Sequence, residues 1–493
     1  MDLPSDASHV GRWRTRFTRL AAVRSAQGCL HGCRQGLIGG RSADSIAPMN
    51  KFRKILALSA SLAASASLHA APVPADAYSI VADLTTEVGQ RLAGTDREAA
   101  ARDWAVARLK ALGFAKVHVE TFPIPGWERG EEKAMITAPV PQKLAVTALG
   151  HSGATPAGGV SGELVYFPTL DALKSAPDGS LKGKIAFVDH AFKPAQDGAG
   201  YGPFGQPRRI GPIIAAQKGA AALLIRSAGT DHTRDPHTGV TNAPKDGAPL
   251  PAGAVSGTDA DLVARLAAKG QVMRVAVTLT PRFTGTVTSG NVIADLPGKD
   301  PSLAPILVGC HLDSWDLGTG AIDDASGCAI VTAAALQASK DGQLARSIRV
   351  LWAGSEEIGG FGGQDYAKVH AKEPHALVME SDSGADRVYA TEMAFAPADK
   401  VLADKLAAAL AQMGITQSLG HPEGGEDVGY TAVSQKTAVI DLKQDATRYF
   451  DWHHTPSDTL ERIDPVQLQQ NVDAWALVLK ILGNETKAIT KLP

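Results

Sequence analysis

An imidazole and a carboxylate, His311 and Asp323, stand twelve residues apart directly after an apolar run of the chain. Histidine nitrogen and carboxylate oxygen are ligands that zinc takes in catalytic sites, and two neighbouring zinc ions need one carboxylate between them. Further acidic residues and histidines follow downstream at similar junctions. We therefore expect a two-metal hydrolase site whose ligands are His311, Asp323, Glu357, Asp382 and His454, with Asp323 as the bridge.

Two further acidic residues are candidates for catalytic work. Glu356 lies next to the predicted ligand Glu357 but is not itself assigned to a metal. An unligated glutamate at such a position can take the proton of the attacking water, as the glutamate of the motif H-E-x-x-H does. Asp313 lies two residues after His311 and could accept the second ring N–H of that histidine. We expect Glu356 to act as the general base and Asp313 to orient His311.

The candidate residues follow segments that are typical of buried strands, and helical patterns lie between these segments. Strands that alternate with helices indicate a mostly parallel sheet. Ligands of such open sheets bind outside the carboxyl ends of the strands, which is where the candidates fall. The strand-like runs are Ala304–Val308, Ser347–Ala353, Ala376–Met379 and Thr437–Leu442.

Each motif taken alone has a simpler interpretation. A Glu-Glu pair is usually a solvated surface, and a lone histidine is more often structural than a ligand. The metal site is favoured because the motifs occur together, in order and at strand ends.

The motif set resembles the co-catalytic zinc exopeptidases of the aminopeptidase S and carboxypeptidase Q type, over nearly the whole chain from about Ala77 onward. Three further segments resemble the carboxypeptidase Q branch, namely Arg91–Gly94, Trp127–Gly130 and Arg448–Phe450. The matching motifs are His311-Leu-Asp313, Asp323-Asp324-x-Ser326-Gly327, Glu356-Glu357, Ser381-Asp382-x-Gly384 and His453-His454-Thr455-x-x-Asp458-Thr459.

The resemblance implies an α/β zinc-exopeptidase fold, with a mostly parallel sheet sandwiched by helices. It implies two zinc ions per chain and a cis peptide between Asp323 and Asp324. One zinc would be bound by His311 and Asp382, and the other by Glu357 and His454. The implied partners are a dipeptide or short peptide with a free terminus, and a second copy of the chain in a homodimer.

A chain of 493 residues exceeds what one core usually serves, so we expect two domains. The catalytic domain would comprise residues 72–125 and 287–493. Residues 126–286 carry short strand-like runs and Gly/Pro loops without a metal motif, and Gly183–Asp189 with Ala215–Leu224 resembles a β-rich protease-associated domain. We expect three of its histidines, His190, His232 and His237, to be solvated loop residues.

The N-terminus indicates export. Residues 49–71 combine a basic start, a short apolar stretch and a small-residue cleavage site, which together predict a signal peptide and a periplasmic or secreted protein. The apolar stretch is too short for a membrane span. Residues 1–48 are an Arg-rich leader that we exclude from the fold as non-native or disordered.

Composition adds two expectations. A net charge of −2 gives no electrostatic case for nucleic-acid binding. Cys310 ends a predicted strand and Cys328 lies in the next predicted helix. An oxidising compartment would allow them to pair, but we expect two buried free thiols.

Other functions and roles remain open at this stage. The same scaffold could serve a glutaminyl-cyclase-like acyltransferase with one zinc, or a dead peptidase used as a receptor, as the transferrin receptor resembles. The polar loop His421–Asp427 could line the substrate pocket through His421 or Asp427, or be a plain turn. We expect Asp458 and Thr459 to hold the ligand loop and not to do chemistry.

Overall fold

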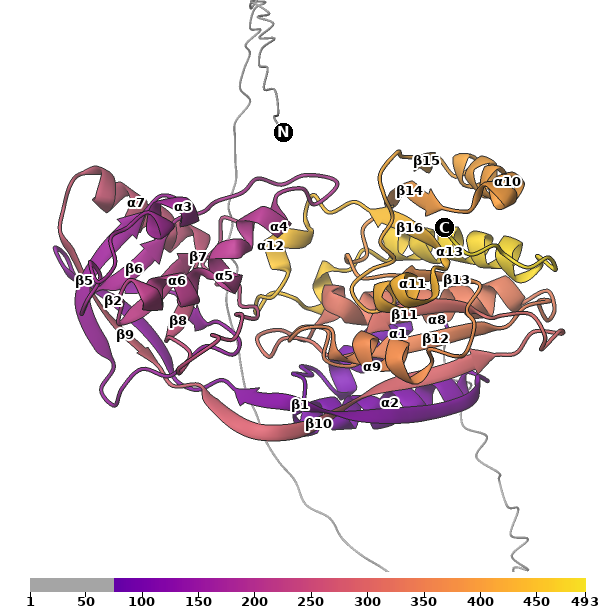
Figure 1. Ribbon diagram of the computed structural model, residues 1–493, viewed down its shortest axis with the longest axis horizontal. Coiled ribbons are helices and arrows are strands. Elements are labelled where there is room, and N and C mark those ends of the chain that lie inside the picture. Colours follow the sequence, from indigo (N-terminus) through magenta and orange to yellow (C-terminus); the bar gives the residue numbers. More distant parts are fainter. Residues whose placement is uncertain (1–74) are drawn as a thin grey trace, which may run out of the picture. The chain divides into compact units, whose positions relative to one another are not determined.

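The computed structural model describes residues 75–493, which form an α/β protein with two eight-stranded sheets (Figure 1). The predicted leader and the predicted signal peptide, residues 1–48 and 49–71, lie outside the described residues. Within the described part, no helix is long and apolar enough to cross a membrane.

The first sheet carries the strands that precede the candidate ligands. Its order is β1-β10-β12-β11-β13-β16-β14-β15. The central strands β12, β11, β13 and β16 run parallel, whereas β1, β10 and β14 pair antiparallel toward the edges. The strands are β1 (Ala115–Glu128), β10 (Arg282–Leu296), β11 (Ile306–His311), β12 (Ile348–Ala353), β13 (Leu377–Glu380), β14 (Val388–Ala394), β15 (Thr416–Gln417) and β16 (Ala438–Gln444).

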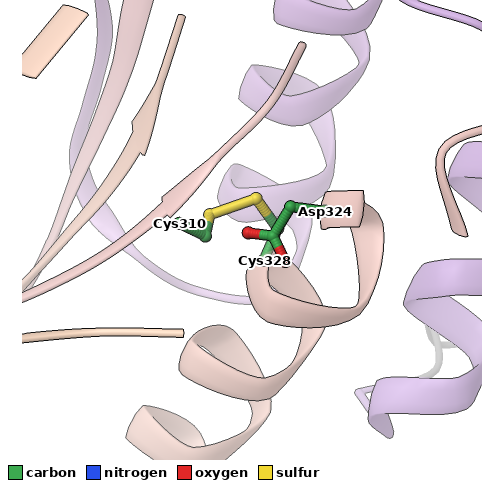
Figure 2. A group of neighbouring side chains, drawn as sticks. All are labelled: Cys310, Asp324 and Cys328. Atoms are coloured by element: carbon green, nitrogen blue, oxygen red, sulfur yellow. A yellow bond between two sulfur atoms is a disulfide. The ribbon is translucent and has the colours of Figure 1, made fainter. Parts of the chain in front are cut away.

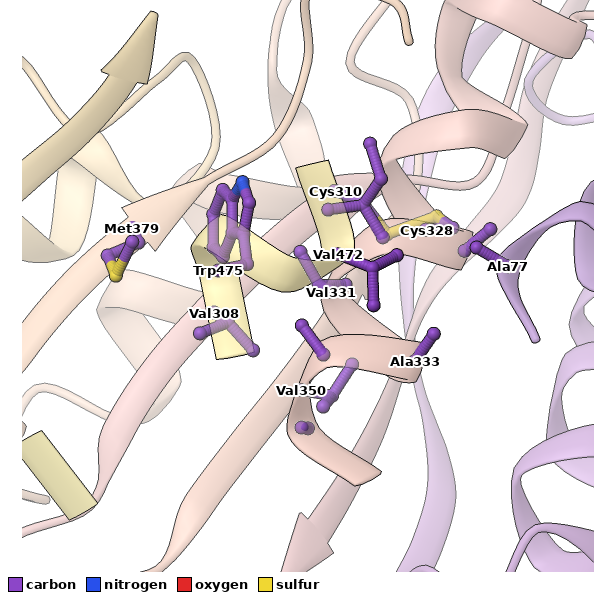
Figure 3. Close-up of a cluster of buried hydrophobic side chains, with 14 of the residues drawn as sticks. Ala77, Val308, Cys310, Cys328, Val331, Ala333, Val350, Met379, Val472 and Trp475 are labelled. Atoms are coloured by element: carbon purple, nitrogen blue, oxygen red, sulfur yellow. A yellow bond between two sulfur atoms is a disulfide. The ribbon is translucent and has the colours of Figure 1, made fainter. Parts of the chain in front are cut away.

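The central strands are buried on both faces because helices cover both sides of the sheet, as the apolar runs predict. On one face, α8 and α13 pack Val331, Val472 and Trp475 against Val308 and Val350 of the sheet (Figure 3). On the other face, α9 and α11 contribute their own buried side chains. The helices that accompany this sheet are α1 (Ala77–Glu87), α2 (Asp96–Ala111), α8 (Ser326–Ser339), α9 (Phe361–Val369), α10 (Lys400–Ala411), α11 (Gly429–Gln435), α12 (Tyr449–Trp452) and α13 (Pro465–Gly483).

The second sheet lies in the segment between β1 and β10, in the order β3-β2-β9-β5-β6-β7-β8-β4. We call residues 126–286, which also include the end of β1 and the start of β10, the insert. Strands β5 to β8 are parallel, so the insert holds strand–helix units as well as antiparallel strands. Its assignment as a protease-associated domain and the domain boundaries stay predictions. Its strands are β2 (Glu132–Ala138), β3 (Gln142–Leu144), β4 (Val146–Ala148), β5 (Val160–Phe167), β6 (Ile185–Val188), β7 (Ala222–Arg226), β8 (Ala252–Val255) and β9 (Met273–Leu279), and its helices are α3 (Leu170–Lys174), α4 (Tyr201–Phe204), α5 (Gln206–Arg209), α6 (Gly211–Gln217) and α7 (Gly257–Ala268).

Cys310 and Cys328 form a disulfide, so the expectation of two free thiols is wrong (Figure 2). Cys310 lies in β11 and Cys328 in the first turn of α8, which packs on that strand. Their Cα atoms are 5.1 Å apart, within the range that a disulfide spans. Sequence spacing alone did not reveal this proximity, because it depends on how the chain folds back between β11 and α8.

Two residues of α13 provide a matched test of the core. Leu479 is 0% exposed and Val466 is 70% exposed. Leu479→Ala removes buried methyl groups and leaves a cavity, so we expect it to lower the free energy of unfolding by about 2–5 kcal/mol. Val466→Ala should change it by less than about 0.5 kcal/mol. Thermal and urea unfolding curves measure both effects, and equal losses would contradict this placement of α13.

The disulfide makes a second prediction. It closes a loop with a sequence separation of 18. Replacing both cysteines by alanine should destabilise the folded chain by about 3 kcal/mol, because the unfolded chain regains the freedom of that loop. Urea unfolding measures the loss. Alkylation of the unfolded, unreduced wild type, followed by peptide mass mapping, should modify neither Cys310 nor Cys328, and labelling of both would refute the pairing.

Candidate metal centre

The five predicted ligands come together at the carboxyl edge of the first sheet. His311 is the last residue of β11, Glu357 follows β12, and Asp382 follows β13. Asp323 lies in the turn η1 (Ala321–Ala325) before α8, and His454 lies in the loop after α12. Because β11, β12 and β13 are parallel neighbours, their carboxyl ends meet and bring residues distant in sequence into one site.

Asp323 stands between two groups of donors. Its Oδ1 lies 3.0 Å from His311 Nε2, and its Oδ2 lies 3.3 Å from His454 Nε2. Asp382 Oδ1 lies 3.5 Å from the same His311 nitrogen, and Glu357 Oε2 lies 2.9 Å from the same His454 nitrogen. The two carboxylate oxygens of Asp323 thus face two different donor sets, which is the geometry that a bridging ligand requires.

The electrostatics of the cluster fit a divalent cation. Burial raises the pKa of Glu357, and repulsion from Asp323 adds to the rise. Burial likewise raises the pKa of Asp324 well above its usual value. Glu357 Oε1 is buried without a hydrogen-bond partner in the described part of the chain. Buried carboxylates beside imidazole nitrogens form the nitrogen and oxygen donor set that zinc binds, so these residues fit zinc.

Two residues of the site have a strained, left-handed backbone conformation. Ser355, directly before Glu356, has φ 65°, and His454 has φ 62°. A left-handed backbone at residues other than glycine costs free energy and is concentrated at functional sites. At both positions this conformation turns the chain sharply where it must aim a side chain into the site.

We expected the carboxylate of Asp313 to orient His311, but the structure shows that it does not. The backbone oxygen of Asp313 lies 3.0 Å from His311 Nδ1, while its carboxylate Oδ1 is 3.8 Å away. The carboxylate instead accepts the backbone N–H of Glu356 at 3.0 Å and of Glu357 at 3.3 Å. Burial raises the pKa of Asp313 to about 7. Asp313 therefore holds the turn that carries the predicted base and one predicted ligand.

Asp324 and Asp458 fix the backbone around Asp323. Asp324 accepts the backbone N–H of His311 at 3.2 Å and of Gly327 at 3.0 Å. Its side chain lies beside the disulfide in Figure 2. The peptide between Asp323 and Asp324 is cis, as the resemblance implies. Asp458 Oδ1 accepts two backbone N–H groups of the η1 turn, each at 2.8 Å, so it holds the loop that carries Asp323.

Arg91 is a supporting residue whose role the residue types did not reveal. It is fully buried, and its guanidinium donates to the carbonyl oxygens of Leu312 at 2.6 Å, Thr319 at 2.7 Å and Gly320 at 3.0 Å. It thus ties together the two ends of the loop between His311 and Asp323. The sequence pointed to Arg91 only through the family resemblance, because a single arginine far from the other motifs carries no spacing signal.

The loop His421–Asp427 has a structural residue at its end. Asp427 is buried, its backbone N–H donates to Glu380 Oε2 at 3.0 Å, and its carboxylate accepts the N–H of Gly363 at 3.2 Å. Burial raises the pKa of Asp427 to about 8. Asp427 therefore holds the loop to its neighbours, and of the two residues considered for substrate contact only His421 is exposed.

The insert histidines differ from one another. His232 is exposed and His190 half-buried, in line with the expectation of loop residues. His237 is buried instead, and its Nδ1 lies 2.7 Å from the backbone oxygen of His453. The expectation for His237 is wrong because the insert packs on the loop that carries His453 and His454, which the local sequence does not show.

Comparison with known proteins agrees with this geometry. The model of peptidase family M28 matches residues 291–479. Carboxypeptidase Q of Homo sapiens is 32% identical over 415 residues, which cover 83% of this chain and 85% of that protein. The chain belongs to peptidase family M28. The enzyme class that the sequence predicts, a zinc metallo-exopeptidase, is therefore confirmed.

Solved structures show that the fold extends over both sheets. The M28 peptidase precursor of Shewanella amazonensis SB2B is 41% identical with a TM-score of 0.82, covering 86% of this chain and 96% of that one. A zinc aminopeptidase of Bacillus subtilis has a TM-score of 0.60 at 19% identity, covering 85% and 97%, which shows the fold alone. The predicted zinc-exopeptidase fold is confirmed.

The role of Asp313 can be tested by Asp313→Asn. An amide has only one oxygen for the two N–H groups that the carboxylate accepts, and its own N–H₂ group would face one of them. We expect kcat to fall about 10–100-fold, because the turn with Glu356 and Glu357 loses its anchor. Peptide hydrolysis measures the change. Asp341→Asn, which alters an exposed pair with Lys480, is the control. Equal kinetics of both variants would contradict the role.

Proposed function

We propose that this chain is a two-zinc exopeptidase that hydrolyses dipeptides or short peptides with a free terminus, with Glu356 as general base. The observation that supports it most directly is the position of Asp323, whose two oxygens face His311 on one side and His454 on the other. Asp382 completes the first donor set and Glu357 the second. His311 and Asp382 would hold one metal ion and Glu357 and His454 the other, with Asp323 available to both.

Zinc bound here would supply a water of lowered pKa and polarise the scissile carbonyl. Glu356 takes the proton of the attacking water and delivers it to the leaving amine. Burial raises the pKa of Glu356 well above its usual value; the charge of His311 opposes this rise, and the charge of Asp382 adds to it. The backbone N–H of Glu356 donates to Asp313, which fixes the turn that carries Glu356 beside Glu357. The base is therefore held in position before substrate binds.

The insert and the named relatives bear on which substrate the site accepts. A cavity beside the donors is lined by Trp315, Glu357, His454 and Thr455. Thr238 of the insert bonds to the His454 backbone at 3.0 Å, so the insert stands directly beside this cavity. A relative named carboxypeptidase Q supports hydrolysis at a carboxyl terminus. Other relatives are named aminopeptidases, so the terminus that is recognised has to be measured.

The same proposal includes a periplasmic or secreted location. The residue pattern over 49–71 supports it, and so does the disulfide between Cys310 and Cys328, because disulfides persist in oxidising compartments. The homodimer that the resemblance implies stays a prediction.

The decisive experiment combines zinc content with hydrolysis of a dipeptide panel for wild type and Glu356→Gln. We expect two zinc ions per chain in both proteins. We expect kcat to fall by about 10²–10⁴-fold in the variant, because the amide cannot accept the proton of water. Glu131→Gln, a change at an exposed position of the insert, is the matched control. N-acetylated and C-amidated dipeptides show which free terminus is required.

Other results would lead to other functions. One zinc ion per chain with cyclisation of glutamine peptides would support the acyltransferase. A folded chain without zinc or turnover would support the receptor. Cleavage of peptides blocked at both ends would contradict an exopeptidase, and full activity of Glu356→Gln would remove Glu356 as the base.

A further inference from the structure

A segment of the insert, residues 231–239, packs against the loop that carries His453 and His454. The backbone N–H of Thr238 donates to the His454 oxygen at 3.0 Å. The Thr238 oxygen in turn lies 3.2 Å from His454 Nδ1. His237 Nδ1 lies 2.7 Å from the His453 oxygen. The insert therefore holds both the backbone and the imidazole of a predicted zinc ligand.

The contact at His454 Nδ1 determines which ring nitrogen can bind metal. His454 Nε2 faces Asp323 and Glu357, so Nδ1 is the nitrogen on the far side of the ring. A carbonyl oxygen only accepts, so the Thr238 oxygen keeps the hydrogen on Nδ1 and leaves the lone pair on Nε2. Arg208 Nη1 also lies 3.3 Å from Nδ1. Because this nitrogen can only donate, its acceptor here is the same Thr238 oxygen, at 3.4 Å, and not the ring nitrogen.

His237 and Asp231 form a buried support behind this contact. Their side chains are only 1% and 4% exposed, and His237 Nε2 lies 2.8 Å from Asp231 Oδ1. The backbone N–H of His237 donates to Ser227 Oγ at 2.9 Å. A Cβ at Gly229 would lie 2.1 Å from the His237 ring, so the ring fills its space closely. Neither side chain touches the predicted metal positions, yet both fix the segment that holds His454.

The first donor set has no such dependence on the insert. His311 is the last residue of β11, and its Nδ1 contacts the backbone oxygen of Asp313 two residues away. The first sheet and its own loops therefore orient His311. His454 lies instead in a loop beyond α12, and its Nδ1 partner belongs to the insert.

We propose that Asp231 and His237 are positioning residues for His454, so that the insert controls metal affinity at the Glu357–His454 position and not at the His311–Asp382 position. This proposal rests on the proposed two-zinc function. It predicts two metal positions that respond differently to changes in the insert, 70 or more residues away from any predicted ligand in sequence.

The test compares zinc and cobalt binding by wild type, Asp231→Asn, His237→Ala and His237→Asn. We expect wild type to hold two ions. His237→Ala should keep one tightly bound ion and bind the second about 10–100-fold more weakly. The affinity of Asp231→Asn for the second ion should lie between those of wild type and His237→Ala. His237→Asn should recover most of the affinity, because its amide N–H₂ can donate to the His453 oxygen. His232→Ala, an exposed change in the same segment, is the control.

Equilibrium dialysis with metal analysis gives the two affinities, and the visible spectrum of bound cobalt reports each position. Excess zinc should restore kcat in His237→Ala, which a misfolded chain could not do. Equal weakening of both ions, or unchanged binding of both, would overturn the proposal while leaving two-zinc catalysis intact. A wild type that holds fewer than two ions would overturn the proposed function together with this inference.

Discussion

The structure around the site depends on keeping several buried carboxylates close together. Glu356, Glu357, Asp313 and Asp324 all have raised pKa values, for which burial is the largest cause. Two like charges 4 Å apart repel by about 4 kcal/mol at the effective dielectric of a protein surface, and more when buried. Such a cluster can exist only if its surroundings supply positive charge and N–H groups at fixed places.

Three kinds of group meet that need. Backbone N–H groups point at Asp313, Asp324 and Asp458. The buried guanidinium of Arg91 ties the loop between His311 and Asp323 and attracts the carboxylates around it. A divalent cation beside Asp323 completes the balance in the proposed function. The supporting carboxylates bond to backbone N–H groups, which keeps the lone pairs of the predicted ligands available.

Much of this arrangement can be predicted from the sequence, because the predicted ligands follow the ends of strands. The run predicted at Ser347–Ala353 matches β12 closely, and the run at Ala304–Val308 overlaps the first half of β11, since strands buried on both faces have continuous apolar sequence. The predicted ligands meet because those strands are parallel neighbours. Asp313, His237 and the cysteine pair were misjudged for a common reason. Their partners are backbone atoms or residues brought close only by folding, and neither leaves a pattern in the chain.

The distance of a ligand from the sheet explains how much support it needs from elsewhere. His311 continues a strand whose register with β12 and β13 already fixes its backbone, so a local carbonyl suffices to orient its ring. His454 follows a short helix and has a left-handed backbone, which costs free energy. Contacts from another part of the molecule must hold it, and the buried Asp231–His237 pair lies where such contacts are made. The insert is therefore part of the metal centre in a physical sense, although none of its residues is a predicted ligand.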